Sequence, residues 1–409
     1  MTKQPSYRFA DYTEPWEKKK LGDFSDVTKL AGFEFTNHVK YSSTGSIIAL
    51  RGLNIKNGNI ILNDVKYIDE SDFSKLNRSK LIINDIMFTY VGTVGELAVI
   101  EDNNKFYLAP NVSRIRILND TYPYFLMQYM WRKSFYQSVI FPLIATSSQP
   151  ALSMENIRKF NISLPEQTAI GSFFQDIDQL ISLQQRKLEV LKEQKKTYLK
   201  LLFPSKGQTK PALRFAGFED EWKEVKLGEV TELKRGLTYK PTSVVENGTR
   251  VLRSSNIDGD VFKKQEDDIF VEDSSVTIPY VQFGDILITA ANGSSKLVGK
   301  HAIIEDSEKM VHGGFMLLAR SKQYKFLNAL LSSEWYSRFI NVSVSGGNGA
   351  IGNLSKSNLE KEIVLCPTIP EQEAIGSFFQ DLDKAIAKQE EKVNQLKESK
   401  QTLLRKMFI

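Results

Sequence analysis

A long segment near the middle of the chain returns at its end. Residues 165–203 and 370–408 both open with Pro-Glu-Gln, and they are identical at 22 of 39 positions when aligned without gaps at an offset of 205. A second pair of segments, RFADYTEPWEKKKLGDF at 8–24 and RFAGFEDEWKEVKLGEV at 214–230, matches at nearly the same offset. Repetition at a fixed period indicates repeated structural units. The chain is therefore expected to fold as two copies of one unit, each opening with one signature and closing with the other.

Both closing segments carry apolar residues at the heptad spacing of a coiled coil. No proline follows the opening Pro-Glu-Gln, and proline is tolerated in the first turn of a helix. We predict two helices of about 39 residues, roughly 58 Å long, that pair with each other in antiparallel orientation. The expected seam residues are Ile170, Phe174, Ile177, Ile181, Leu188, Leu191, Ile375, Phe379, Leu382, Ile386, Val393 and Leu396.

The seam also holds polar residues at the same places in both copies. Gln184 corresponds to Gln389, and Lys195 corresponds to Lys400. An apolar stripe is more often the inner face of a helix in an ordinary core, but these outer faces are too charged for full burial. Polar seam residues lower stability and restrict register. This pattern favours a helix pair whose outer side is exposed.

Between the two signatures, each half reads as short strands broken by turn residues. An Asn57-Gly58-Asn59 turn lies between apolar runs, and apolar residues recur three and four apart in 122–140 and 324–342. We therefore predict an α/β (α+β) fold with two globular domains related by a pseudo-two-fold repeat. The expected division is a first domain over 1–163, the central helix over 164–205, a second domain over 206–368 and the C-terminal helix over 369–409.

Composition sets limits on the class of protein. The net charge of +5 and the pI near 8.9 lean towards a polyanionic partner, and the single cysteine, Cys366, excludes an internal disulfide. The first residues lack the apolar core of a signal peptide, and no run of 18 apolar residues occurs. We expect a cytoplasmic protein without a membrane span. The histidines His38, His301 and His312 lack the spacing of metal ligands, so no metal centre is expected.

The chain as a whole resembles the specificity subunit of type I restriction-modification systems. The motifs that carry this resemblance are LPEQTAIGSFFQDID at 164–178 and IPEQEAIGSFFQDLD at 369–383, supported by Trp16 to Gly22 and Trp222 to Gly228. The first copy is about three residues shorter before its helix. The resemblance implies two target-recognition domains that alternate with two helical conserved regions, and it covers essentially the full length.

The resemblance implies a reader of DNA that has no catalytic residues of its own. Each domain would read one half of a bipartite, asymmetric target on double-stranded DNA, and the helices would set the spacer. Two modification subunits, which methylate adenine N6, would dock on the helices, and restriction subunits would join them. We expect no cofactor in this chain: S-adenosylmethionine, ATP and Mg²⁺ would bind the partners.

Reading DNA needs hydrogen-bonding groups on loops, together with cations for phosphates. By resemblance, such loops correspond to 90–93 and 291–296, and a second pair of loops, 145–149 and 345–349, precedes each closing unit. The segment around 293–301 departs from a phosphate-binding loop in both its glycine spacing and its His301. The expected DNA contacts are Thr93, Arg114, Arg116, Ser147, Ser148, Gln149, Asn292, Ser294, Ser295, Lys296, Lys300 and Asn348.

Two other interpretations stay open at the level of sequence. A self-contained DNA methyltransferase with a degenerate cofactor loop would bind S-adenosylmethionine without a partner, although the Asn/Asp-Pro-Pro-aromatic motif of such enzymes is absent. A coiled-coil scaffold would bind no DNA, which a salt-dependent mobility shift tests.

Overall fold

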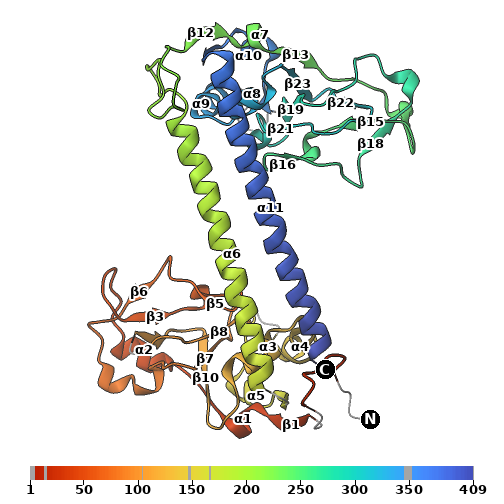
Figure 1. Ribbon diagram of the computed structural model, residues 1–409. Coiled ribbons are helices and arrows are strands. Elements are labelled where there is room, and N and C mark those ends of the chain that lie inside the picture. Colours follow the sequence, from red (N-terminus) through yellow and green to blue (C-terminus); the bar gives the residue numbers. More distant parts are fainter. Residues whose placement is uncertain are drawn as a thin grey trace. The chain divides into compact units, whose positions relative to one another are not determined.

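The computed structural model describes residues 5–12, 16–103, 105–145, 149–164, 167–344 and 352–408. Contacts divide the chain into unit 1, which comprises 1–185 and 391–409, and unit 2, which comprises 186–390. Each unit mixes short strands with helices and contains part of both long helices, α6 (Gln167–Leu201) and α11 (Ile369–Met407) (Figure 1). The predicted mixed helix and strand fold is confirmed. The division into four segments stays a prediction, because the boundaries between the units fall inside the helices.

Unit 1 is built around a four-stranded antiparallel sheet in the order β2–β10–β7–β8. Strand β7 reads IMFT and is buried at all four positions, as expected for a strand covered on both faces. A three-stranded sheet, β6–β3–β9, and the pairs β1–β11 and β4–β5 complete the strands. Their bounds are β1 (Glu17–Lys20), β2 (Ser25–Lys29), β3 (Ile48–Leu50), β4 (Ile55–Lys56), β5 (Asn59–Ile60), β6 (Lys66–Tyr67), β7 (Ile86–Thr89), β8 (Leu97–Val99), β9 (Phe106–Leu108), β10 (Val112–Ile117) and β11 (Asn161–Leu164).

Unit 2 repeats this plan. Its central sheet has the order β13–β23–β19–β21, and the pair β12–β25 corresponds to β1–β11. The parallel pairing of β3 with β9 recurs as β15 with β22, inside a four-stranded sheet β14–β18–β15–β22. The bounds are β12 (Lys223–Lys226), β13 (Glu232–Arg235), β14 (Val244–Val245), β15 (Thr249–Leu252), β16 (Ile257–Asp258), β17 (Val261–Phe262), β18 (Ile269–Val271), β19 (Ile286–Thr289), β20 (Ala291–Asn292), β21 (His301–Ile303), β22 (Met310–His312), β23 (Met316–Arg320), β24 (Gly352–Asn353) and β25 (Ile363–Cys366).

The shorter helices repeat in the same way. The helical stretches predicted at 122–140 and 324–342 are confirmed, but each is interrupted by one extended residue, Arg132 or Ser333. The bounds are α1 (Leu21–Phe24), α2 (Gly32–His38), α3 (Pro123–Trp131), α4 (Lys133–Phe135), the π-helical η4 (Tyr136–Ile140) and α5 (Met154–Arg158) in unit 1, then α7 (Leu227–Val230), α8 (Tyr324–Leu331), α9 (Glu334–Ser343) and α10 (Lys356–Lys361) in unit 2. None of the helices in the described part of the chain is long and apolar enough to cross a membrane.

The long helices run in opposite directions within each unit. In unit 1 the start of α6 lies against the end of α11, where the ring centroids of Phe174 and Phe408 are 5.8 Å apart. In unit 2 the end of α6 lies against the start of α11, where the rings of Tyr198 and Phe378 are 5.1 Å apart. All twelve predicted seam residues are buried or half-buried. The predicted antiparallel pairing is confirmed in each unit, over 35 residues for α6 and 39 for α11.

Lys195 and Lys400, the equivalent seam lysines, each form an ion pair with an aspartate at equivalent positions of the two halves. Lys400 Nζ lies 2.6 Å from Asp178 Oδ1 in unit 1, and Lys195 Nζ lies 2.7 Å from Asp383 Oδ1 in unit 2. Burial lowers the pKa of Lys400, and the Asp178 carboxylate opposes that shift. Buried charges must be paired to be tolerated, and such pairs are best known for restricting register. The two seam lysines therefore form charged pairs that repeat with the chain.

Each unit is completed by the end of a helix that begins in the other unit. Phe408 follows α11 and packs in the core of unit 1 with Trp16 and Phe125, at ring separations of 6.2 and 5.6 Å. Phe203 follows α6 and occupies the equivalent place in unit 2, with Trp222 and Phe326 at 5.8 and 5.9 Å. The tryptophans of the opening signature thus pack on the phenylalanines of the closing one. This contact explains why both signatures repeat.

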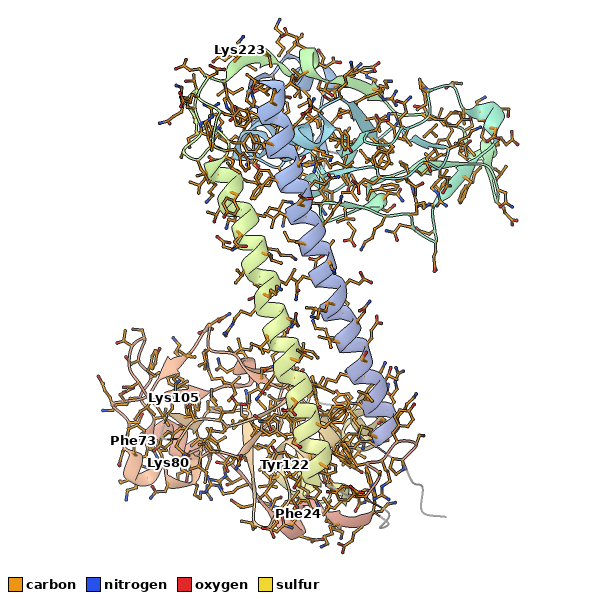
Figure 2. The ribbon with its side chains drawn as sticks, in the orientation of Figure 1. Phe24, Phe73, Lys80, Lys105, Tyr122 and Lys223 are labelled. Atoms are coloured by element: carbon orange, nitrogen blue, oxygen red, sulfur yellow. The ribbon has the colours of Figure 1, made fainter. Side chains whose placement is uncertain are left out.

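A repeated glycine lets a core helix approach each long helix. Tyr122, labelled in Figure 2, lies against α6, where its hydroxyl donates a 2.7 Å hydrogen bond to Gln175. A side chain at Gly171 would come within 2.1 Å of the Tyr122 ring, and one at Gly376 would come within 2.6 Å of the backbone nitrogen of Phe326. The glycine in each Ala-Ile-Gly-Ser-Phe-Phe motif is therefore required by close packing.

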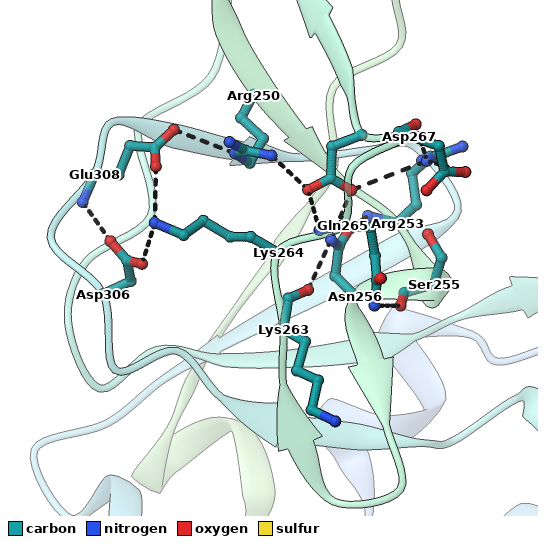
Figure 3. Close-up of polar contacts among 11 residues, drawn as sticks. Arg250, Arg253, Ser255, Asn256, Lys263, Lys264, Gln265, Asp267, Asp306 and Glu308 are labelled. Carbon is teal, nitrogen blue, oxygen red and sulfur yellow. Dashed lines mark hydrogen bonds and ion pairs between the residues drawn. The ribbon is translucent and has the colours of Figure 1, made fainter. Parts of the chain in front are cut away.

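A polar network fixes the β16–β17 hairpin of unit 2 (Figure 3). The Asp268 carboxylate accepts hydrogen bonds from Arg250 at 2.6 Å and Asn256 at 2.8 Å, and the ammonium of Lys264 lies 2.8 Å from Asp306. The hairpin carries Asp260 to within 2.6 Å of Lys195 on α6. The network thus links the β14–β18–β15–β22 sheet, which contains Arg250, to Lys195 on α6.

The stability of unit 2 should depend on pH through two buried histidines. Burial lowers the pKa of both His301 and His312 below the ordinary value of 6.5, and the Asp260 carboxylate partly opposes the shift at His301. Below pH 6.5 the unfolded chain binds protons that the folded unit excludes. Stability is therefore present above pH 6.5 and is lost as the pH falls, by up to about 1.4 kcal/mol per pH unit for each histidine.

Hydrogen exchange measured between pH 7.5 and 5.5 checks this prediction. After correction for intrinsic exchange, peptides of unit 2 should lose protection as the pH falls, and His301→Gln should roughly halve the slope. Unit 1 serves as the internal control, because its single histidine, His38, is half-exposed. Protection of unit 2 that stays constant over this range would contradict the argument.

Candidate nucleic-acid interface

Equivalent loops gather at one end of the central sheet in unit 1. The registers Lys29↔Ser113 and Val112↔Thr89 place the ends of β2 and β7 beside the start of β10. We call this the loop end of the sheet. Here the backbone nitrogen of Gly92 donates a 2.9 Å hydrogen bond to Pro150. The two loops that the sequence singled out in this half, after Thr89 and before Leu152, thus lie side by side.

In unit 2 the loop that begins at Ala291 is joined, at the equivalent end of the central sheet, to the strand β24; we call this the loop end of unit 2. Ala291 and Asn292 form β20, which pairs with β24, and the backbone nitrogen of Leu354 donates a 2.7 Å hydrogen bond to the carbonyl of Ala290. In unit 1 the matching bond runs from Leu152 to Tyr90, at 2.8 Å. The frame that joins the loops is therefore the same in both halves.

Several predicted contact residues present polar groups at the loop end. Thr93, Gln149, Ser294, Ser295 and Lys296 are exposed, whereas Asn292 and Lys300 are half-buried. Ser147, Ser148 and Asn348 lie outside the described residues. The structure thus places the described residues of these loops at the loop end of each unit.

Two loop residues are held by hydrogen bonds to their own turn or to a neighbouring segment. The Asn292 amide donates to Ser254 at 3.1 Å, and its oxygen accepts from the backbone of Ser294 at 3.0 Å. In unit 1 the Thr89 hydroxyl donates to the carbonyl of Thr93 at 2.5 Å. These bonds fix the shape of the loops and position neighbouring exposed groups before any ligand arrives.

Arg114 and Arg116 require a different assignment from the expected phosphate contacts. Arg114 is only 4% exposed and forms an ion pair with Asp26, while Arg116 donates two 2.7 Å hydrogen bonds to Asp85. The bonds to Asp85 raise the pKa of Arg116. The guanidinium of Arg114 is buried and that of Arg116 is half-exposed, and each is already paired with a carboxylate of unit 1. We leave both out of the proposed DNA surface.

The sheet itself supplies cations that sequence reasoning missed. Lys29 ends β2 and is exposed, with its ammonium 5.2 Å from the centre of the Tyr90 ring. Arg235 ends β13 at the equivalent place in unit 2 and is also exposed. Their registers, Lys29↔Ser113 and Arg235↔Leu317, show the equivalence. Aligning the two halves strand by strand could have found this pair.

The remaining reactive groups found in the described residues are structural. Cys366 ends β25, is buried, and has its pKa raised to about 12 by that burial. Within the described ranges, no group of three or more His, Cys, Asp or Glu residues is placed to hold a metal ion. His301 Nδ1 lies 2.9 Å from Asn328 Oδ1 inside unit 2. These side chains contribute packing and buried hydrogen bonds, and the polar loops at each loop end are the strongest candidate site.

Comparisons with known proteins agree with the repeated plan. Two curated proteins of Methanocaldococcus jannaschii, named for the specificity subunits of the type I restriction enzymes MjaX and MjaVIII, are each 23% identical over 96% of this chain and cover 92% and 91% of their own length. The crystal structure of the type I restriction-modification S subunit from M. genitalium has a TM-score of 0.66 at 15% identity, covering 100% of this chain and 99% of that one.

A second solved chain supports the same fold. It comes from a study of complex assembly and conformational transition of the type I restriction-modification system, with a TM-score of 0.53 at 16% identity, and covers 98% of this chain and 99% of that one. The family described as the type I restriction modification DNA specificity domain matches twice, over residues 13–193 and 219–398. The chain therefore belongs to the family of type I restriction-modification specificity subunits, with two recognition domains.

Proposed function

We propose that this chain selects DNA targets for a type I restriction-modification complex and performs no catalysis itself. Each unit would read one half of a bipartite, asymmetric site through the loops at its loop end. The observation that carries this proposal is the repetition of one hydrogen-bonded frame with two different sets of loop residues. Direct readout requires such side chains to reach base edges in a groove.

The helix pair would set the distance between the two half-sites and dock two modification subunits. The paired lysines in the seam and the packed helix ends support a rigid spacer. The modification subunits would carry S-adenosylmethionine and methylate adenine N6 after flipping the base out. Restriction subunits, with ATP and Mg²⁺, would complete the nuclease. The complex would act on chromosomal and incoming DNA in the cytoplasm.

Exchanging one recognition domain tests the independence of the two readers. Residues 24–150 would be replaced by the corresponding segment of a related specificity subunit, and the methylated motif would be read by methylome sequencing of cells that also carry the modification subunit. One half of the motif should change while the other half and the gap stay constant. Simultaneous change in both halves would show that the units do not read separately.

A further inference from the structure

Two equivalent turns at the loop ends were not singled out by the sequence. The turn 109–111 joins β9 to β10, and the turn 313–315 joins β22 to β23. Their first residues are anchored alike, by hydrogen bonds from Ala109 to Leu50 at 3.1 Å and from Gly313 to Leu252 at 2.8 Å. The backbone of the two turns is thus held by the same bonds in both units.

The last residue of each turn is anchored to the neighbouring loop. The carbonyl of Asn111 accepts a 3.1 Å hydrogen bond from Tyr90, and the carbonyl of Phe315 accepts bonds of 2.9 and 3.0 Å from Ala290 and Ala291. These donors begin the loops already assigned to the candidate interface. Asn111 and Phe315 therefore lie at equivalent places among the exposed loops and present different side chains there.

Both side chains are presented to solvent. Asn111 is exposed, and Phe315 is 69% exposed, among the highest values for a large apolar side chain in the described chain. Asn111 has a φ of 72°, which asparagine tolerates better than most residues. No such requirement accounts for Phe315. Single exposed apolar side chains are common on protein surfaces, but this ring lies among polar loops of the candidate interface, where it can contact an apolar group of a base.

We infer that Asn111 and Phe315 each contact one base pair, and that the chemical type of each side chain determines which base it recognises. A carboxamide pairs with the N6 and N7 edge of adenine in the major groove, and an apolar ring contacts the C5-methyl group of thymine. The first half-site would then contain an adenine read by Asn111, and the second a thymine read by Phe315. Lys29 and Arg235, at the ends of the adjoining strands, would meet the flanking phosphates.

This inference rests on the proposed function, and base analogues separate the two. The complex of this chain with its modification subunit would be tested on duplexes that carry its methylated motif, with each thymine of the second half-site replaced in turn by deoxyuridine. At one position, loss of the methyl group should weaken binding by the wild-type complex about four-fold, the value of one buried methyl. The complex that carries Phe315→Ala should bind the normal duplex about four-fold more weakly than wild type, and replacing thymine by deoxyuridine should not weaken its binding further.

The role of Asn111 is tested in the same way in the first half-site. Replacing one adenine by purine, which lacks the N6 amino group, should weaken binding by the wild-type complex about tenfold, and Asn111→Ala should remove that sensitivity.

Phe283→Ala is the matched control for Phe315→Ala, because Phe283 is 60% exposed in unit 2 but lies away from the loop end, before β19. Phe315→Leu should retain part of the methyl sensitivity.

The outcomes are distinct. A wild-type complex that binds its bipartite duplex but shows no deoxyuridine-sensitive position, or whose second half-site contains no A·T pair, overturns the assignment of Phe315 while leaving the proposed function intact. If deoxyuridine weakens binding equally for wild type and Phe315→Ala, the assignment of Phe315 is also overturned. That result would favour a protein surface as the partner of the ring. A complex that binds no bipartite duplex overturns both.

Discussion

Replacing Phe408 with alanine should lower the free energy of unfolding of unit 1 by about 3 to 5 kcal/mol, the range for deleting a buried phenyl ring. Phe408 is only 4% exposed and packs on Trp16, Phe125 and Phe174, and the Arg132 guanidinium lies 4.7 Å from its ring centre. A loss of this size is a large fraction of the about 5 to 15 kcal/mol by which an ordinary domain is stable. Hydrogen exchange of unit 1 peptides measures the loss.

Phe203→Ala is the matched test in the other half. Phe203 follows α6, which begins in unit 1, yet its side chain packs with Trp222 and Phe379 of unit 2. The substitution should therefore loosen peptides between 222 and 366 and spare those between 16 and 164. Phe141→Ala, at a ring that is 64% exposed, should change stability by less than about 0.5 kcal/mol. Loosening of unit 1 by Phe203→Ala would contradict the exchange of helix ends.

Lengthening both long helices by one heptad should lengthen the gap between the methylated half-sites. The insertions lie between Gln185 and Arg186 in α6 and between Asn394 and Gln395 in α11, so the seam keeps its phase on either side. Seven residues add about 10 Å to a helix, which corresponds to about three base pairs of duplex at roughly 3.4 Å each. Methylome sequencing would report the new gap.

As a control for the added length, the same seven residues are inserted outside the helices. An insertion after Gly207, in the exposed segment that follows α6, should leave both half-sites and the gap unchanged. An insertion in α6 alone should abolish methylation, because the seam of the helix pair loses its register. If the double insertion methylates the original motif with the original gap, the helices do not act as a spacer.

Much of the fold could be predicted because the informative patterns are local. Heptad spacing identified the helix pair, and the Asn57-Gly58 pair marked a hairpin turn whose two residues have φ values of 54° and 79°. The exchange of helix ends was not predicted. Phe203 and Phe408 are the last residues of the repeated segments, and only tertiary packing shows that each completes the core of a unit.

The candidate site was less predictable, because exposure depends on partners that are distant in sequence. Arg114 and Arg116 look like phosphate ligands in the sequence, but Asp26 and Asp85 neutralise them from neighbouring strands. Phe315 looks like a core residue, yet its turn places the ring in solvent. Only the register of the strands shows that it shares an edge with the polar loops.

The methylome of cells that carry this chain with its modification subunit tests the central claim most directly. The account predicts a single methylated motif of two short, unlike half-sites, separated by an unspecified gap of fixed length. Two units with one frame and different loops would read unlike halves, and a helix pair that acts as a spacer would fix the gap. A contiguous motif, identical half-sites or a gap of variable length would contradict it.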